Sequence, residues 1–215
     1  MKQLVIIGTG GLAREVYDFL PETLGYGIEW QLKGFLEGDM PQKKTAYELL
    51  YAPLLGDIYT YEIEENDVFV CAIANPQVKM RLTQYIEEKG GQFINIIDRS
   101  ARVSLHARLG EGIILYGGTG ISCDALIGDH VLINAYSSIG HDAEVGAYST
   151  IFSYVNITGY VKIGERTIWG SGSRVLPKAR IESDSVVGTG SVVLKRVKAG
   201  QTVFGIPAMP IFEAN

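Results

Sequence analysis

One short stretch of the chain could do acid–base chemistry. Residues 139–146 read IGHDAEVG, so His141 and Asp142 stand side by side between two glycine steps. An imidazole titrates near neutral pH and can take a proton from an attacking amine or hydroxyl group. A neighbouring carboxylate can hold the ring in one tautomer. A histidine in a glycine-flanked turn is also an ordinary structural residue, so the rest of the sequence has to decide between the two interpretations.

A second stretch could bind phosphate. The segment GTGGLA (8–13) follows an apolar run and precedes a helical pattern, where backbone N–H groups and a helix N-terminus can hold phosphate oxygens. Glu37, after the next apolar segment, could bond a ribose hydroxyl with Asp39 nearby, and Ala74 and Asn75 would face the same crevice. The pattern fits NAD, another nucleotide ligand, or a tight turn without a ligand.

The composition excludes several classes of protein. The chain has 215 residues, of which 47% are hydrophobic and 20% charged, and this is typical of a folded globular protein. A net charge of -5 argues against a general nucleic-acid surface. Cys71 and Cys123 are too few for a disulfide framework or a zinc site. The first apolar run is too short for a signal peptide or a membrane span, so we expect a cytoplasmic protein.

The first 98 residues alternate strands and helices. We expect strands at 3–7, 32–36, 67–73 and 92–97, and helices at 11–20 and 76–90. The second helix opens at Pro76 and closes at Gly90 and Gly91. This alternation predicts a mostly parallel α/β sheet that amounts to one Rossmann-like half-domain. A dinucleotide spans two such halves, which counts against NAD.

From residue 99 onwards the chain follows a repeat of six residues. Every sixth residue from Val103 to Val193 is Leu, Ile or Val, and Trp169 is the exception among these anchors. The residue two places before each anchor is Ala, Ser, Thr or Val, except at Ile113. No insertion breaks this phase, so the repeat is the strongest signal in the sequence.

The repeat predicts a parallel β-helix. The large anchor and the small residue face the same way in an extended segment, and three segments close a triangular coil of eighteen residues. Coils stacked about 4.8 Å apart form a prism that the aliphatic side chains fill. A β-sandwich would instead show alternation with a period of two and turns about every 8–12 residues.

The hexapeptide repeat resembles that of the left-handed β-helix acyltransferases, which are typically trimers with acetyl-CoA between neighbouring prisms. The preceding α/β domain narrows the resemblance to sialic acid O-acetyltransferases and nucleotide-4-aminosugar N-acetyltransferases of the bacillosamine and perosamine type. The stretches that carry it are VIIGTGGLAREV, GFLEGD, CAIANPQVKMR, IGHDAEVG and VFGIPA. The expected fold is a Rossmann-like half-domain (1–98) followed by a left-handed parallel β-helix with a C-terminal cap (99–215).

The resemblance implies roles for residues in both parts. His141 would be the general base and Asp142 would orient it. The period of eighteen residues predicts that Cys123 and Gly159 stack against His141 in the neighbouring coils. In the family that the chain resembles, the glycine at the place of Gly159 binds the thioester oxygen. The implied nucleotide-sugar contacts are Gly8, Thr9, Gly10, Gly11, Glu37, Asp39, Ala74 and Asn75. The expected acetyl-CoA contacts are Gly159, Arg174, Lys178, Lys195, Ile206 and Pro207, with Arg196 and Lys198 as further cations.

Three positions depart from the family pattern. Asp142 replaces the usual glutamate, Thr150 replaces a second histidine, and Met209 stands where a lysine or arginine is common. His106 and His130 do not fall in the stacking column of His141, so we expect no metal site of the kind found in trimeric β-helix carbonic anhydrases.

The leading hypothesis is an acetyl-CoA-dependent N-acetyltransferase. Its acceptor would be a UDP- or dTDP-linked 4-amino-4,6-dideoxy sugar, whose amine attacks the thioester directly. The alternatives are a sugar O-acetyltransferase of the sialic acid type and a non-catalytic trimeric scaffold with a nucleotide-sensing domain. We expect a homotrimer that uses no metal and binds neither nucleic acid nor membranes.

Overall fold

A computed structural model describes residues 1–38 and 51–212 of the chain. The chain divides into two compact units, residues 1–99 (unit 1) and residues 100–215 (unit 2). Asp39, which the sequence placed near a ribose, lies outside the described residues. No helix in the described ranges is long and apolar enough to cross a membrane.

Unit 1 is built on a parallel sheet of five strands in the order β3-β2-β1-β4-β5. The strands are β1 (Lys2–Ile7), β2 (Trp30–Glu37), β3 (Leu54–Asp57), β4 (Asp67–Cys71) and β5 (Gln92–Phe93), and β6 (Ile96–Ile97) follows them. The helices are α1 (Gly11–Phe19), the short 3-10 helix η1 (Leu20–Glu22) and α3 (Pro76–Glu88). The strand order reverses between β1 and β4, and open parallel sheets bind ligands at such a point.

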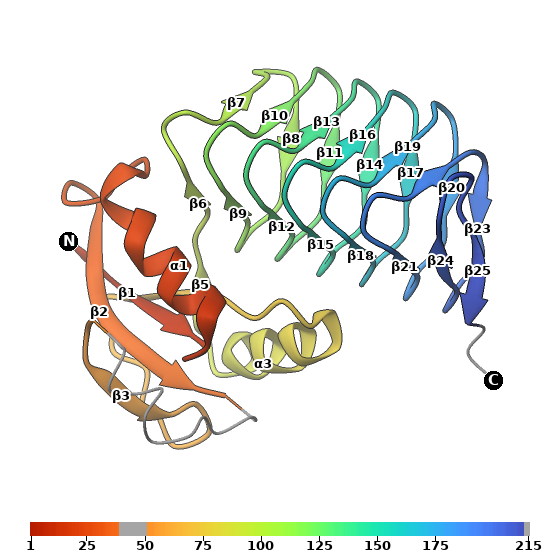
Figure 1. Cartoon of the computed structure of the whole chain (residues 1–215). Helices are drawn as coiled ribbons and strands as arrows, with labels where there is room; N and C mark the ends of the chain where they lie inside the picture. Colours follow the sequence, from red (N-terminus) through yellow and green to blue (C-terminus); the bar gives the residue numbers. More distant parts are fainter. Residues whose placement is uncertain (39–50, 213–215) are drawn as a thin grey trace. The chain divides into compact units, whose positions relative to one another are not determined.

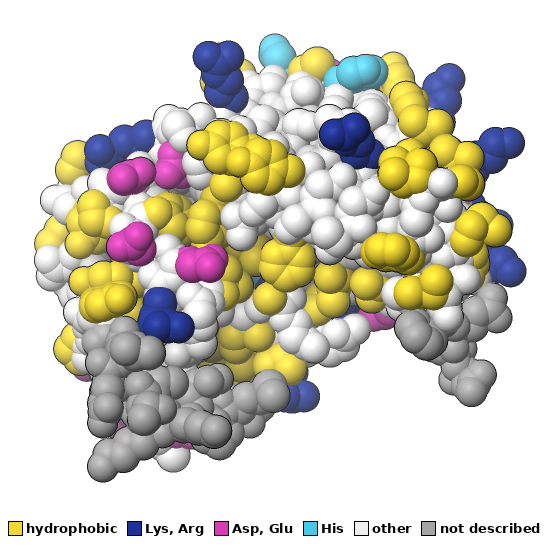
Figure 2. Space-filling model, in the orientation of Figure 1, with side chains coloured by type: hydrophobic (Ala, Val, Ile, Leu, Met, Phe, Trp, Pro, Cys, Tyr) yellow, Lys and Arg dark blue, Asp and Glu magenta, His cyan; other side chains and the backbone are white. Residues whose placement is uncertain are grey.

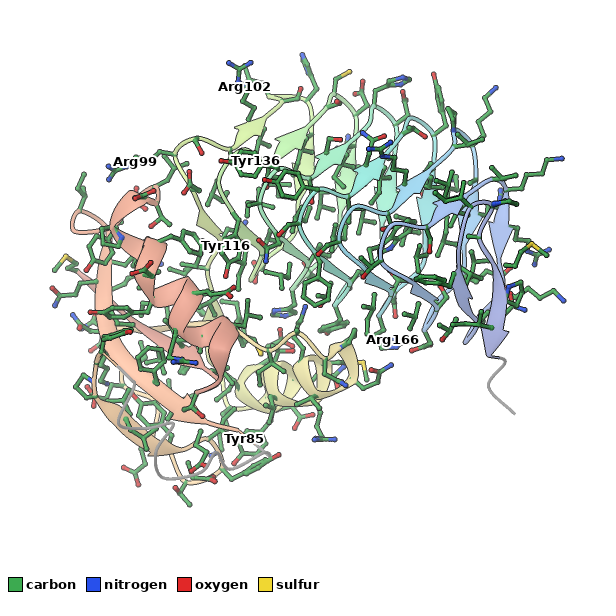
Figure 3. The ribbon with its side chains drawn as sticks, in the orientation of Figure 1. Tyr85, Arg99, Arg102, Tyr116, Tyr136 and Arg166 are labelled. Carbon is green, nitrogen blue, oxygen red and sulfur yellow. The ribbon has the colours of Figure 1, made fainter. Side chains whose placement is uncertain are left out.

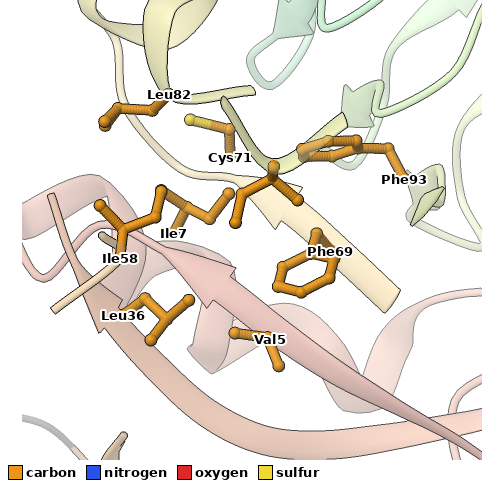
Figure 4. Close-up of a cluster of buried hydrophobic side chains, with 9 residues drawn as sticks. Val5, Ile7, Leu36, Ile58, Phe69, Cys71, Leu82 and Phe93 are labelled. Carbon is orange, nitrogen blue, oxygen red and sulfur yellow. The ribbon is translucent and has the colours of Figure 1, made fainter. Parts of the chain in front are cut away.

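The core of unit 1 explains the apolar runs in the sequence. The central strands β1 and β4 are buried on both faces, so their sequences are continuously apolar rather than alternating. Figure 4 shows the cluster that lies between these strands and α3. Its buried members are Val5, Ile7, Leu36, Ile58, Phe69, Cys71, Leu82, Ile86 and Phe93.

Unit 2 is a parallel β-helix with three faces, and its coils lie side by side in Figure 1. Face 1 comprises β7 (Arg102–Val103), β10 (Gly120–Ile121), β13 (Ser138–Ile139), β16 (Asn156–Ile157), β19 (Arg174–Val175) and β22 (Val192–Val193). Face 2 comprises β8 (Arg108–Leu109), β11 (Leu126–Ile127), β14 (Glu144–Val145), β17 (Lys162–Ile163), β20 (Arg180–Ile181) and β23 (Arg196–Val197). Face 3 comprises β9 (Ile114–Leu115), β12 (Leu132–Ile133), β15 (Thr150–Ile151), β18 (Ile168–Trp169), β21 (Val186–Val187), β24 (Thr202–Phe204) and β25 (Met209–Phe212).

The register of these strands follows the predicted repeat. Each anchor pairs with the anchors eighteen residues away, as Ile139 does with Ile121 and Ile157. Trp169 takes its place in the ladder without exposure to water, and its indole N–H donates to Thr167 Oγ1 at 3.1 Å. The interior therefore accommodates the one aromatic anchor because the small residue two places earlier supplies a hydrogen-bond acceptor.

Two-residue turns join the faces, and the second residue of most of them has a positive φ. The turns from face 1 to face 2 lie one above another at 105–106, 123–124, 141–142, 159–160 and 177–178, and we call this edge corner 1. Asp142 and Tyr160 have φ values of 57° and 60°. Left-handed residues at a fixed place in each coil make successive side chains project from the corner in register.

The repeat shortens at the C-terminal end, beyond the last anchor in phase, Val193. Ile181 pairs with Val197 and Val187 with Val203, two residues short of the eighteen-residue period. β25 then turns back antiparallel to β24. The segment between these strands extends face 1, because Val192 N donates to Gly205 O at 3.0 Å and Ala208 N donates to Val192 O at 2.9 Å.

Candidate active site

The candidate base lies at the surface of corner 1. His141 and Asp142 are the two residues of one turn, and His141 Nδ1 lies 2.8 Å from Asp142 Oδ2. The imidazole side chain is 53% exposed and the carboxylate 41%. Figure 2 shows histidine side chains on the surface along this side of the β-helix. With Nδ1 held by the carboxylate, Nε2 is the ring nitrogen that can exchange a proton with a substrate.

Gly159 occupies the next coil, beside this free nitrogen. A Cβ atom at residue 159 would lie 2.7 Å from His141 Nε2, so only glycine leaves the ring in its present place. The Gly159 carbonyl accepts a hydrogen bond from Lys178 N at 3.1 Å. Within residues 1–38 and 51–212, the Gly159 N–H has no acceptor. The corner thus places a basic nitrogen next to a free backbone donor, as the sequence predicted.

Tyr160, which the sequence analysis did not select, contacts the imidazole of His141. The ring of Tyr160 meets the ring of His141 edge-on, with centroids 5.0 Å apart and planes at 90°. Tyr160 N also donates to His141 O at 3.0 Å. The sequence signal was weak because Tyr160 and His141 are nineteen residues apart, one more than the stacking period.

The residues predicted to hold the cofactor border the C-terminal end of face 1. Lys178 and Lys195 lie at corner 1, in the coils beyond Gly159, and both are exposed. Arg174 lies on face 1 in β19 and is also exposed. Ile206 and Pro207 belong to the segment that extends the same face past β22. Cations and apolar side chains are therefore gathered along one surface that starts at His141.

The two remaining predicted cations of this group lie further along. Arg196 Nε donates to Glu182 Oε1 at 2.8 Å and so has a carboxylate partner already. Lys198 is exposed and its backbone N donates to Gln201 Oε1. Arg196 would have to exchange this partner before binding a phosphate group.

The other histidines and Thr150 lie away from the His141–Asp142 turn. His106 is exposed in the turn at 105–106, two coils from His141. His130 is buried at a different corner, and its ring stacks on Tyr148 with centroids 5.3 Å apart. Thr150 is fully buried in β15 on face 3. Within this chain, Thr150 does not stand beside the imidazole of His141.

Unit 1 carries a separate pocket of about 190 Å³ at the point where the strand order reverses. Its lining residues are Gly8, Thr9, Gly10, Gly11, Leu12, Gly38, Ala72, Ile73, Ala74 and Val78. Gly8 has a φ of 115°, and a Cβ atom there would lie 3.0 Å from Ala72 O. Glycine is therefore required for the loop to pass this closely over the end of β4.

The pocket gathers five of the predicted nucleotide-sugar contacts and leaves two aside. Glu37 ends β2 and Asn75 caps α3, where its side chain accepts from Val78 N at 3.0 Å, and neither lines the pocket. Gly38 and Val78 line it and were not selected. The sequence signal for Gly38 was its position directly after β2. Its close contact with α3 depends on tertiary packing, because a Cβ atom at residue 38 would lie 2.8 Å from Leu82 Cδ1.

Burial decides the protonation of two groups next to this pocket. It raises the pKa of the Cys71 thiol to about 12, so this thiol is not a nucleophile at neutral pH. It lowers the pKa of the Lys79 ammonium to about 8, while the nearby thiol acts in the opposite direction. Cys71 is part of the hydrophobic cluster rather than of a reactive site.

Comparisons with known proteins bear on both units. Residues 3–86 match the family model of the PglD N-terminal domain, and this range contains every residue that lines the pocket of unit 1. No curated protein matches the chain by sequence.

Solved structures match the chain over nearly its full length. PerB from Caulobacter crescentus, in complex with CoA and GDP-perosamine, is 29% identical and covers 98% of this chain and 97% of its own, with a TM-score of 0.86. The acetyltransferase domain of PglB from Neisseria gonorrhoeae, in complex with acetyl coenzyme A, is 25% identical over 98% and 99%, with a TM-score of 0.86. WeeI from Acinetobacter baumannii shares the fold at 22% identity, 98% and 100% coverage and a TM-score of 0.81. The predicted fold class, a Rossmann-like half-domain followed by a left-handed parallel β-helix, is confirmed.

Proposed function

We propose that this chain is a hexapeptide-repeat acyltransferase that transfers an acetyl group from acetyl-CoA to the amine of a nucleotide-linked amino sugar. The observation that carries the proposal is the turn at corner 1, where Asp142 holds Nδ1 of His141 and Gly159 adjoins Nε2. PerB and PglB, the relatives with CoA or acetyl-CoA bound, support the choice of donor.

The transfer follows from the groups at corner 1. The neutral amine attacks the thioester carbonyl carbon and His141 Nε2 takes its proton, so a carbon–nitrogen bond forms as charge develops on the carbonyl oxygen. The Gly159 N–H, which has no acceptor among the described residues, can donate a hydrogen bond to that oxygen. The carbon–sulfur bond then breaks, and the imidazolium returns the proton to the CoA sulfur. Asp142 stabilises the imidazolium between these two steps.

Acetyl-CoA would lie along the surface that begins at His141. The exposed cations Lys178, Lys195 and Arg174 follow it towards the C-terminal end, where they can pair with phosphate oxygens. Ile206 and Pro207 offer an apolar border on the same face. This order of groups matches a cofactor with a thioester at one end and phosphates at the other.

The nucleotide would bind in the pocket of unit 1. Gly8, Gly10 and Gly11 allow phosphate oxygens to approach the backbone, and α1 begins at Gly11, so the N–H groups of its first turn can donate to a phosphate. The sequence predicted UDP or dTDP as the nucleotide, whereas PerB was solved with GDP-perosamine. The acceptor screen therefore has to include all three nucleotides.

The test is an acceptor screen with purified protein and acetyl-CoA. UDP-, dTDP- and GDP-linked 4-amino sugars are compared with free sialic acid, and CoA release is followed with a thiol reagent. We expect release with at least one amino sugar and a product that carries one N-linked acetyl group. Transfer to a sugar hydroxyl alone would replace the proposal with O-acetylation. Failure to bind acetyl-CoA at millimolar concentration in calorimetry would favour the scaffold.

A homotrimer is part of the proposal, because the resemblance implies that acetyl-CoA lies between neighbouring prisms. Native mass spectrometry of the full chain should give three copies. A monomer that still turns over would contradict a site shared between subunits.

A further inference from the structure

We infer that Tyr160 is a positioning residue of the active site and holds the imidazole of His141 so that Nε2 stays beside Gly159. The inference rests on the proposed function of corner 1. It comes from the edge-on contact between the two rings, which have centroids 5.0 Å apart.

The backbone fixes Tyr160 in place. Tyr160 is the second residue of the turn at 159–160. It lies one coil from Asp142, which is the second residue of the turn at 141–142 of the same corner. Its φ of 60° and the hydrogen bond from its N to His141 O, at 3.0 Å, tie this turn to the one below. The ring is therefore carried by the rigid stack of coils and not by a mobile loop.

A comparison with the other stacked rings shows why this contact differs. Tyr136 and Tyr154, eighteen residues apart, are nearly parallel, with planes at 16° and centroids 5.2 Å apart. His130 and Tyr148, also eighteen apart, lie at 14°. Tyr160 and His141 differ by nineteen residues, from the second to the first turn position, and their planes are perpendicular. Figure 3 shows Tyr136 among the side chains of the β-helix.

The perpendicular contact complements the other restraints on the imidazole. Asp142 holds Nδ1 at 2.8 Å, which leaves the ring free to swing about this bond. An edge-to-face aromatic neighbour restricts that swing on one side of the ring, which remains about half exposed to solvent. Tyr160 itself is 50% exposed, so its ring lies at the surface beside the imidazole and is not part of the hydrophobic core.

The test compares two variants at Tyr160 with a matched control. Tyr160→Asn removes the ring and keeps a residue that tolerates a positive φ. Tyr160→Phe keeps the ring and removes the hydroxyl. The control is Tyr154→Asn, because Tyr154 has the same turn position, a φ of 61° and 63% exposure at a different corner.

We expect Tyr160→Asn to lower kcat about two- to tenfold with little change in the KM for acetyl-CoA, since an aromatic pair of this kind has that worth. Tyr160→Phe and Tyr154→Asn should keep the wild-type kcat. Wild-type kcat in Tyr160→Asn would overturn the inference. An equal loss in Tyr160→Phe would also overturn it, because the hydroxyl and not the ring would then matter.

A second measurement does not depend on the reaction. Diethyl pyrocarbonate modifies free imidazoles, and peptide mass spectrometry can follow its rate at His141. We expect faster modification in Tyr160→Asn than in the wild type and in Tyr154→Asn. Unchanged reactivity would contradict the inference. Faster modification in a protein that acetylates no amino sugar would uphold the contact and reject the proposed function.

Discussion

At the level of single residues, the proposed catalysis depends on the groups that border the two ring nitrogens of His141. Gly159 borders Nε2 on one side and Asp142 binds Nδ1 on the other. The stacking period of eighteen predicted the neighbour at Gly159, because residues of one column meet whatever their side chains are. The same period did not predict the contact between Tyr160 and His141. These residues lie in neighbouring columns, and contacts between columns depend on the side-chain rotamers.

Gly159→Ala tests this closeness. The added methyl group would lie 2.7 Å from Nε2 and displace the ring, so we expect kcat to fall about a hundredfold, the cost of a displacement of this size. The control is Gly120→Ala on face 1, where a Cβ atom meets nothing within 4 Å. Melting temperatures of both variants should stay close to that of the wild type. Equal turnover in the two variants would mean that the ring has more freedom than the structure gives it.

At the scale of elements, the sequence predicted what the periodicity determines. The hexapeptide phase predicted the strands of the β-helix from β7 to β22, since one inward anchor per segment leaves no alternative register. It did not predict β23, β24 and β25, which lie beyond the last anchor in phase, Val193. The strand β3 was not predicted because its four residues, Leu54–Asp57, are half-buried or exposed at the sheet edge and carry no apolar pattern. The burial of Lys79 on α3 was not predicted either, because a lysine in a helix is ordinarily exposed.

An ion cluster ties β2 to β4 and gives unit 1 a pH dependence. Lys33 Nζ lies 2.8 Å from Asp67 Oδ1 and 3.0 Å from Glu64 Oε1, and the Tyr61 hydroxyl donates to Asp67 Oδ2 at 2.7 Å. Burial alone would raise the pKa of Asp67, but hydrogen bonds from Lys33, the Glu64 N–H and Tyr61 outweigh it and lower the pKa below its ordinary value. The carboxylate therefore stabilises the fold fully above its unfolded-state pKa of about 3.9, and this contribution is lost as the pH falls through the lower folded-state pKa.

Asp67→Asn should lower the free energy of unfolding at pH 7 by about 3 kcal/mol, because it leaves Lys33 without its buried partner. The variant should also lose the part of the acid sensitivity that Asp67 causes. Denaturant unfolding at neutral and acidic pH measures both effects, with Trp30 as the reporter of unit 1 in a Trp169→Phe background. Glu65→Gln, at an exposed neighbouring position, is the control and should behave like the wild type. A similar loss of stability at pH 7 in both variants would contradict the role of the cluster.

At the scale of the whole molecule, the two units are expected to bind different ligands. The change from strand–helix alternation to a hexapeptide repeat could be read from the sequence, because the two patterns have different periods. The lining of the pocket could be read only in part. The spacing of the glycines in GTGGLA predicts that they line a ligand site, whereas Ile73 and Val78 line the pocket because of how β4 and α3 pack.

Gly8→Ala separates the two binding functions. The substitution strains a φ of 115° and places a methyl group 3.0 Å from Ala72 O, so we expect nucleotide-sugar binding to weaken about tenfold or more. The affinity for acetyl-CoA should stay the same. Gly56→Ala is the matched control, since its φ is 128° and a Cβ atom there meets nothing within 4 Å. Calorimetry with each ligand decides the matter, and equal losses for both ligands would contradict separate sites.

The most direct test of His141 as the general base is the turnover of His141→Ala with the acceptor found in the screen. Removal of a general base should lower kcat about a hundred- to ten-thousandfold. Calorimetry should give an unchanged affinity for acetyl-CoA, because the substitution removes a group beside the reacting carbonyl and leaves the proposed phosphate contacts in place. A variant that keeps near-wild-type turnover would show that His141 is not the base, and the account of corner 1 as the catalytic site would be wrong.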